Sequence, residues 1–430
     1  MTLTMRKKLS LAVATITLAS SVSANQLADL YQQARSYDAQ LLSAQAQGNA
    51  ALQDDVITKA ELLPRIDLTG SVSDNNGNRI SNGVEVPSSV ELSLIQPLFD
   101  LSKFYSYQRA KTLSESAKIS LSLAEQDLIQ RLVTSYLDIL SAKGTLEVAE
   151  SRERALSRRL DQVNAQFDVG LIAITDVLEA RASYDDARVG LIDAKGALSN
   201  SFEAMERISG AAIKDIAPLS ADYPITGLSV SDTEQWVAKA LKGNLGLKRA
   251  ALNETAATQQ LEASKALALP TLEFSAALNQ SESSFSGDSG GSTLGMRLKV
   301  PLYRGGATTA GERKAEYQAA QRQYEYDDAL REVTQSTRSL VRDIQTSVAS
   351  VEARMKSIES RETALEATEQ GFEVGTRNVV DVLDAENALF VARQNYIDAR
   401  LGHIKLQFAL KQTVGTLSPE DIVTLDNWLK

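Results

Sequence analysis

Two short acidic motifs are the parts of this sequence whose residue types and spacing could do chemistry. Asp176 is followed by Glu179, and Asp381 by Asp384, so each motif holds two carboxylates three positions apart. At this spacing both carboxylates share one helix face. They could act as a general acid and base, stabilise a helix start, or line a pore and select cations. The rest of the sequence decides among these three chemistries.

The composition argues against catalysis and against binding of metal or nucleic acid. The 430 residues contain no cysteine and one histidine, His403, so a Ser-His-Asp triad has one possible base and a zinc site almost no ligands. We interpret His403, which lies in a helical stretch, as a packing residue. The formal net charge of −10 leaves no electrostatic footprint for nucleic acid. We therefore expect neither an enzyme nor a cofactor.

Residues 1–24 have the form of a secretory signal peptide. A basic start at residues 6–8 is followed by an apolar stretch at 9–19 and by small residues at 22–24, where cleavage is expected. No later segment has the roughly 18 uninterrupted apolar residues of a membrane helix. We expect an exported protein, either soluble or a β-barrel.

The chain after the signal consists of one unit that occurs twice. The acidic motifs lie in matching glycine turns, QFDVGLIAITDVLEA (166–180) and GFEVGTRNVVDVLDA (371–385), which are 205 positions apart. Pro64 and Pro97 have counterparts in Pro270 and Pro301 at nearly the same separation. Such a long fixed period indicates a tandem duplication. We divide the chain into the signal peptide (1–24), a first repeat (25–215), a linker (216–230), a second repeat (231–417) and a short C-terminal segment (418–430).

Each repeat begins with a helix and two strands. In the first repeat a helix over 26–62 ends before a proline, and alternating apolar residues over 66–72 and 90–94 predict two strands around the turn-rich loop 74–83. The second repeat has the same alternation over 272–278 and 294–300 around the loop 283–292. We expect two β-hairpins whose strands of roughly ten residues are long enough to cross a bilayer when tilted.

A very long helix and a shorter one complete each repeat. Residues 102–169 and 308–373 lack proline and have apolar residues at threes and fours, which predicts coiled-coil helices of ~100 Å. Helices over 26–62 and 174–209 are each about half as long, so two of them stacked end to end match one long helix. The linker then lies at mid-height, and the turns at Gly170 and Gly375 lie at the tip farthest from the strands.

Four strands cannot close into a barrel by themselves, because about eight strands are the practical minimum. In lipid, each open sheet edge would leave unpaired backbone groups. The edges must then pair with further copies of the chain, giving eight strands from two copies, twelve from three or sixteen from four. Physical reasoning alone favours a cyclic oligomer but does not determine how many copies of the chain it contains.

With the stretch IQPLFDLSKF (95–104) and the two turn motifs, the sequence closely resembles the TolC family of outer-membrane efflux channels. The resemblance covers nearly all of the chain after the signal. It implies a mostly α-helical homotrimer with an α-barrel of long helices in the periplasm and a twelve-stranded β-barrel in the lipid of the outer membrane. It also implies a passive exit duct for efflux or type I secretion. A periplasmic adaptor, expected near Gly170 and Gly375, and an inner-membrane RND or ABC transporter would be its partners.

The resemblance gives the acidic turns a role at a pore. Asp381 and Asp384 match the acidic pair that lines the closed periplasmic entrance, and three copies would form two stacked carboxylate rings that select cations. The alternative is that each motif is an aspartate N-cap followed by an acid, which satisfies free amides at a helix start. We expect both roles to apply.

An entrance latch is implied by the same resemblance. Arg377 has no basic counterpart in the first turn, where Ile172 stands. By resemblance Arg377 bonds Thr175 and Asp176 of the neighbouring helix pair and holds the entrance shut. Phe372 replaces a tyrosine of the family pattern, so its ring can pack but cannot donate a hydrogen bond. We expect a closed state that depends more heavily on Arg377.

Two alternatives to a channel remain at this point. A soluble periplasmic coiled-coil adaptor would explain the long helices but not the two hairpins of membrane-spanning length. A hydrolase that uses Asp381 and Asp384 would need a concave pocket, whereas the sequence predicts rods.

Overall fold

The structure, a computed structural model, describes residues 26–72, 88–229, 232–282 and 289–430. The expected signal peptide, the loop 74–83 and residues 283–288 of the second loop lie outside this part of the chain. Within it, the order of elements in the first half recurs in the second half.

The first half consists of α1 (Gln26–Tyr37), α2 (Ala39–Ala60), β1 (Arg65–Val72), β2 (Ser88–Phe99), α3 (Leu101–Asp168) and α4 (Ile174–Ser209). The second half consists of α5 (Thr233–Gly243), α6 (Leu245–Ala266), β3 (Thr271–Glu282), β4 (Ser289–Lys299), α7 (Ala307–Glu373) and α8 (Val379–Val414), followed by α9 (Pro419–Asp426). The expected mostly helical fold with four strands is confirmed.

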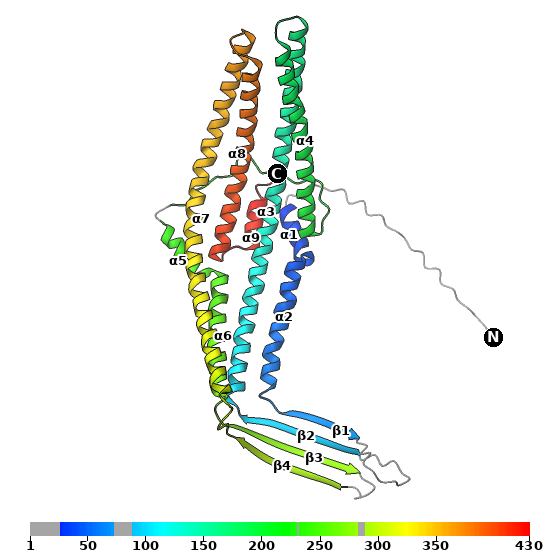
Figure 1. Ribbon diagram of the computed structural model, residues 1–430, viewed down its shortest axis with the longest axis vertical. Coiled ribbons are helices and arrows are strands. Elements are labelled where there is room, and N and C mark those ends of the chain that lie inside the picture. Colours follow the sequence, from blue (N-terminus) through cyan, green and yellow to red (C-terminus); the bar gives the residue numbers. More distant parts are fainter. Residues whose placement is uncertain (1–25, 73–87, 230–231, 283–288) are drawn as a thin grey trace, which may run out of the picture.

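The two long helices set the shape of the molecule. α3 has 68 residues and α7 has 67, and both run from the sheet at one end to the tip turns at the other (Figure 1). Asp100 is the N-cap of α3, and its side chain accepts a hydrogen bond from the Lys103 amide at 3.1 Å. The expected position of both glycine turns, at the tip farthest from the strands, is confirmed. None of the helices in the described ranges is long and apolar enough to cross a membrane.

The single helix expected over 26–62 is wrong, because Asp38 interrupts it. Asp38 has extended backbone angles (φ −61°, ψ 113°), and its side chain accepts a hydrogen bond from the Leu41 amide, so it ends α1 and caps α2. Asn244 does the same between α5 and α6. Helix periodicity does not reveal these breaks, since a cap interrupts the hydrogen bonding without interrupting the apolar pattern.

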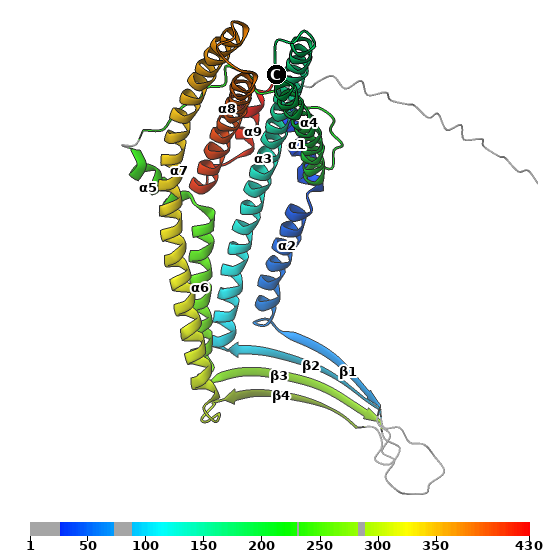
Figure 2. The ribbon, with the colours of Figure 1, turned by 45° about the horizontal axis from the view of Figure 1, so that its top comes forward.

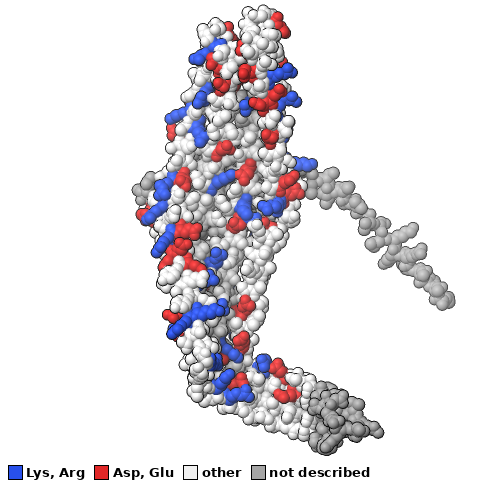
Figure 3. Space-filling model, viewed as in Figure 1, with Lys and Arg blue, Asp and Glu red and all other residues white. Residues whose placement is uncertain are grey.

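The strands form one antiparallel sheet in the order β1-β2-β3-β4, so the two expected hairpins are joined by the pairing of β2 with β3 (Figure 2). The register brings apolar residues together on one face, as in the pairs Leu68↔Leu92 and Leu92↔Leu278. This face is open: Leu68 is 72% exposed and Leu294 76%. Few charged side chains lie on the visible surface of the sheet beyond those beside the helices, whereas the helical body carries both signs throughout (Figure 3).

The largest buried cluster of the described residues lies at mid-height and joins α1 and α9 to the linker (Figure 1). Ile216 and Ala217 of the linker are buried in it, and Leu219 forms a β-bridge with Leu429. The short C-terminal segment contains α9, which begins with a capping box at Ser418. The linker is therefore part of a packed layer.

His403 is fully buried on α8. Its ring nitrogens lie 2.7 Å from the Ser347 hydroxyl on α7 and 2.9 Å from the Gln407 side-chain amide. The interpretation of His403 as a packing residue is confirmed, and burial lowers the pKa of the imidazole.

Candidate pore entrance at the helical tips

Each helix pair turns at its tip through a glycine with positive φ. Gly170 has φ 75° and Gly375 has φ 78°, a conformation that residues with a Cβ rarely adopt. Gly170 donates to the Phe167 carbonyl at 2.8 Å, and Gly375 donates to the Phe372 carbonyl at 3.1 Å. The two turns therefore reverse the chain by the same backbone geometry.

The second tip has a complete capping box, but not at the expected residue. Asn378 is the N-cap of α8: its side-chain oxygen accepts from the Asp381 amide at 2.8 Å, while the Asp381 carboxylate accepts from the Asn378 amide at 3.2 Å. The expectation that Asp381 is the N-cap is therefore wrong by three positions. Asp381 occupies the third helical position, where a carboxylate still satisfies a free amide and complements the helix dipole.

The first tip lacks such a capping box. The N-cap of α4 is Ala173, which has no side-chain group to accept a hydrogen bond, and Asp176 again stands at the third helical position. The two tips thus share their glycine turns and their acids but differ in the residue that caps the helix.

Arg377 lies beside the acidic pair of its own tip. Its guanidinium is 3.9 Å from the Asp381 carboxylate, one helical turn away. Within the described residues of this single chain, its ion pair is to Asp381 and it makes no bond to Thr175 or Asp176. Thr175 and Asp384 are exposed, whereas Asp176 and Asp381 are half-buried. The latch expected across helix pairs stays a prediction.

Phe372 packs where the two helix pairs meet. Its ring is half-buried against an apolar cluster near the tips that includes Val163 of α3, Val177 of α4 and Val379 of α8. The expectation that this ring packs is confirmed. The cluster joins the pair α3/α4 to the pair α7/α8, so any movement between the pairs must disturb it.

A buried charge cluster just behind the tips was not anticipated from the sequence. Arg159 of α3 donates to Glu369 of α7 at 2.6 Å and to Glu386 of α8 at 2.9 Å. Arg159 and Glu386 are less than a tenth exposed, and burial raises the pKa of the Glu386 carboxyl while the bond from Arg159 opposes this shift. One arginine therefore ties the two helix pairs together.

The sequence does contain a signal for this cluster. Arg159 stands three positions after Leu156 and four before Val163, both of which are buried, so it occupies the apolar seam of α3. A charged residue at a seam position requires a charged partner on a facing helix. The partner could not be named in advance, because Glu386 is 227 positions away.

Comparisons with known proteins agree with this architecture. The family model described as "Outer membrane efflux protein" matches residues 30–211 and 236–416. The chain is similar to the outer membrane protein TolC of Vibrio cholerae serotype O1, at 32% identity over 96% of each chain. It is also similar to the alkaline protease secretion protein AprF of Pseudomonas aeruginosa, at 26% identity over 92% of this chain and 85% of that protein.

Among solved structures, the chain is similar to the outer membrane protein VceC of Vibrio cholerae. The TM-score is 0.78 at 17% identity, with 91% of this chain and 98% of that chain covered. Members of the matched family are channels of the Gram-negative outer membrane, and this assignment removes the soluble periplasmic adaptor as an alternative. With both halves matched by the family model, the chain belongs to the outer membrane efflux protein family.

Proposed function

We propose that three copies of this chain form a passive exit duct, with a twelve-stranded β-barrel in the outer membrane and an α-barrel that reaches into the periplasm. The chain itself would catalyse no reaction. Efflux or type I secretion would be driven by an inner-membrane RND or ABC transporter. A periplasmic adaptor that contacts the tips around Gly170 and Gly375 would couple the transporter to the duct.

The sheet is the observation that carries this proposal. It exposes an apolar face, and β1 and β4 are its two outer strands. Outer strands in lipid leave backbone groups without partners at a cost of several kcal/mol each. Pairing β4 of one copy with β1 of the next would satisfy both edges and close the sheet, and it would turn the apolar face to the lipid.

The acidic pair would act at the narrow end of the duct. Asp381 and Asp384 lie one turn apart at the start of α8, and around a three-fold axis they would form two carboxylate rings that favour cations. The two rings would contribute unequally. Asp381 is engaged by the Asn378 amide and by Arg377, whereas Asp384 is exposed. We expect Asp384 to contribute more to selectivity.

Arg377 would hold the entrance closed from within the same turn. Its side chain is 60% exposed, so its pairing with Asp381 leaves the guanidinium free to reach a second acceptor. In the closed trimer Thr175 and Asp176 would be those acceptors. Phe372 would support the closed state by packing alone.

Single-channel conductance in planar bilayers tests the proposal. We expect small, cation-selective steps from the purified protein and larger steps from Arg377→Ser. Arg393→Ser is the matched control, because Arg393 pairs with Glu362 inside one helix pair and its loss should not open the entrance. Asp384→Asn should lower cation selectivity more than Asp381→Asn does. Conductance unaltered by Arg377→Ser would remove the latch, and failure of well-folded protein to insert would contradict the channel.

A further inference from the structure

The first turn of α1 is bound by segments from distant parts of the chain. The Asp426 carboxylate of α9 accepts hydrogen bonds from the Leu27 amide at 3.1 Å and from the Ala28 amide at 3.3 Å. The Gln26 side chain accepts another from the Ala217 amide of the linker at 3.0 Å. The first amides of a helix have no partner within the helix itself. Asp426 therefore does for α1 what an N-cap side chain ordinarily does.

Asp426 differs from the other buried carboxylates because it lacks a cation. Three carboxylates in the described ranges are less than a tenth exposed, and Asp426 is the most deeply buried of them at 1%. Asp38 pairs with Arg131 and Glu386 pairs with Arg159. Within the described chain Asp426 has no such ion pair. Because a buried charge without a counter-charge is costly, we expect a cation from outside the described residues.

Protonation of Asp426 would not remove the need for a partner. Burial raises the pKa of the carboxyl group, and the hydrogen bonds from the two amides oppose this shift. Both oxygens already accept from N–H groups, whereas a protonated carboxyl would also need an acceptor for its hydroxyl. The neighbouring charge that acts on Asp426 in the described chain is the exposed acid Asp29. The hydrogen bonds thus favour the ionised carboxylate, and Asp29 adds to the need for a cation.

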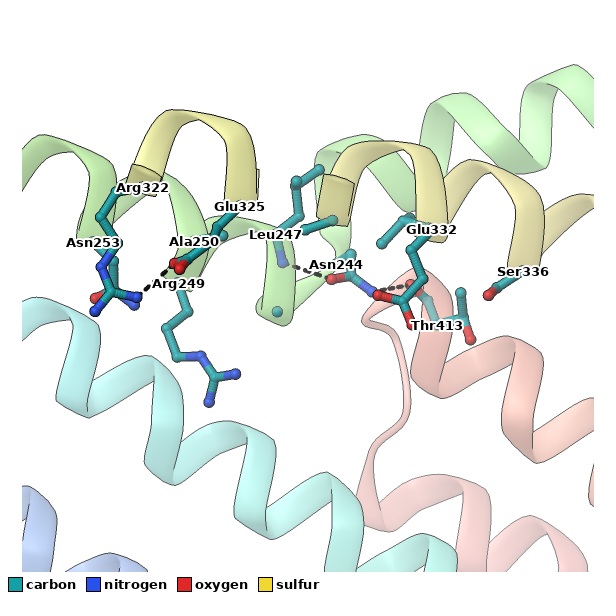
Figure 4. Close-up of a pocket in the computed structure, with 13 residues that line it drawn as sticks. Asn244, Leu247, Arg249, Ala250, Asn253, Arg322, Glu325, Glu332, Ser336 and Thr413 are labelled. Carbon is teal, nitrogen blue, oxygen red and sulfur yellow. Dashed lines mark hydrogen bonds and ion pairs between the residues drawn. The ribbon is translucent and has the colours of Figure 1, made fainter. Parts of the chain in front are cut away.

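A neutral residue meets the same capping need at the start of α6. The Asn244 side chain accepts from the Leu247 amide and donates to the Thr413 carbonyl, each at 2.8 Å (Figure 4). Asparagine and aspartate are about equally good at this position of a helix. The aspartate at 426 therefore adds a buried negative charge that capping alone does not require.

The cation can come from cleavage of the expected signal peptide. Cleavage after Ala24 would make Asn25 the first residue and free its α-amino group, which is mostly protonated at neutral pH because its ordinary pKa is about 7.7–8.0. Two residues of chain span at most about 7 Å, so this amine cannot lie farther than that from the Leu27 amide, which Asp426 already binds. Before cleavage the same nitrogen is an uncharged peptide amide.

We propose that the α-ammonium group of the processed chain, on Asn25, forms an ion pair with Asp426, so that signal cleavage supplies the missing charge and completes the buried cluster at mid-height. An uncleaved chain would keep Asp426 buried without a cation, and α1 would be held by its hydrogen bonds alone. Processing would thereby strengthen the contact between the first helix and the last. The ion pair would form whether or not the chain conducts.

The pKa of the α-amine tests the ion pair. Mass spectrometry of the purified protein identifies its first residue, and the rate of acylation of the N-terminal peptide across pH gives the pKa, because only the neutral amine reacts. A carboxylate partner should raise this pKa by about one unit or more. Acylation of the wild type at neutral pH should therefore be about tenfold slower than acylation of Asp426→Asn.

Two further variants make the test specific. Asp29→Asn is the matched control, because it removes an exposed acid from the same helix start and should leave the rate nearly unchanged. Insertion of one glycine between Ala24 and Asn25 moves the amine away while Asp426 stays intact. It should raise the rate about as much as Asp426→Asn does, and it keeps the test possible if Asp426→Asn does not fold.

The ion pair should also give stability a dependence on pH. A raised amine pKa stabilises the folded state below the ordinary value of about 7.7–8.0, and this contribution is lost as pH rises through the raised value. In the described chain the other titratable groups at this helix start are Asp29 of α1, Tyr136 of α3 and Asp215 of the linker with its partner Lys143. Burial raises the pKa of Tyr136, and Lys143 lowers that of Asp215, so neither titrates in this window.

The outcomes decide for or against the ion pair. The stability gap between the wild type and the glycine insertion should be largest near neutral pH and should shrink between about pH 8 and about pH 9.5. A constant gap, an ordinary amine pKa in the wild type, or a first residue other than Asn25 would overturn the proposal. An acylation rate that responds to Asp29→Asn and not to Asp426→Asn would overturn it as well, since the amine would then pair with the exposed acid.

Discussion

The two halves of this chain share a backbone plan but are held together by different interactions. In the first half, the charged side chain of Arg131 on α3 fixes the break between α1 and α2 by pairing with Asp38. Arg159, also on α3, ties the first half to the second through Glu369 and Glu386. In the second half, local backbone features hold the corresponding places: the close contact of Gly243 with Gly415 at the break between α5 and α6, and the capping box of Asn378 at the tip. Duplication therefore preserved the apolar pattern and the glycine turns, while the polar side chains that set rigidity diverged.

Removal of Arg159 should have the largest effect. Arg159→Ala leaves the Glu386 carboxylate buried without a cation, which typically costs about 3–5 kcal/mol. Ala364 holds the corresponding position of the second half, 205 residues later, so Ala364→Ser is the matched control. Thermal unfolding in detergent should show a large drop for the first variant only.

The stability lost in Arg159→Ala should also depend on pH. Without Arg159 the pKa of Glu386, already raised by burial, rises further. The folded state then holds a proton that the unfolded state releases near pH 4.3, so the variant loses stability as pH rises through the raised pKa. Glu386→Gln in the same background should remove this dependence. If the difference in stability between wild type and Arg159→Ala is the same at every pH, the buried Glu386 carboxylate is not its cause.

Loss of Arg131 should be the next largest effect. Arg131→Ala removes two charge-assisted hydrogen bonds to buried Asp38, worth about 2–3 kcal/mol in total because the arginine is itself partly exposed. Ser336→Ala, at the corresponding position of α7, 205 residues later, should change stability by less than about 0.5 kcal/mol. If Arg131→Ala and Ser336→Ala shift the unfolding midpoint equally, Arg131 contributes no more to stability than its counterpart in the second half.

Acid should selectively weaken the pairing of Asp38 with Arg131. The hydrogen bonds from Arg131 lower the pKa of Asp38, so its contribution is complete above the ordinary aspartate pKa of about 3.9 and is lost as pH falls through the lowered value. Asp38→Asn should abolish this component. The stability gap between wild type and Asp38→Asn should be constant near neutral pH and narrow in acid, and unfolding midpoints across pH measure it.

The caps offer a smaller and reciprocal test. Asn378→Ala should cost about 1 kcal/mol, and Ala173→Asn should recover a comparable amount at the first tip, where the cap is missing. Hydrogen exchange of the first-turn amides of α4 and α8 would report both changes. If Ala173→Asn does not raise the free energy of unfolding, the first tip is held by packing and not by its cap.

Arg377 should matter least for stability. Its ion pair with Asp381 is 3.9 Å long and largely exposed, so Arg377→Gln should change the free energy of unfolding by less than about 0.5 kcal/mol. A large drop in stability would mean that this residue is a structural tie. The enlarged conductance expected of Arg377→Ser would instead show an effect on opening without an effect on folding.

Much of this fold could be predicted because its signals are local. The long helices begin and end within a residue of the expected positions, and the boundaries of α4, Ile174–Ser209, are those expected. Glycine turns and prolines mark these ends through the backbone angles they require or forbid, and helical periodicity marks the interior. The acids of the tips and the packing of Phe372 could also be anticipated, because they follow from short motifs.

Features that depend on a distant partner were decided by the tertiary structure. The sequence by itself determined the duplication, the rods, the strands and the tip turns, since each of these is encoded by neighbouring residues. It did not determine the breaks at Asp38 and Asn244, the pairing of β2 with β3, or the cluster around Arg159. Whether a polar residue caps a helix, pairs with a cation or bonds a backbone carbonyl depends on which group another segment brings to it. Only the folded chain brings Arg131 to Asp38 and the Thr413 carbonyl to Asn244.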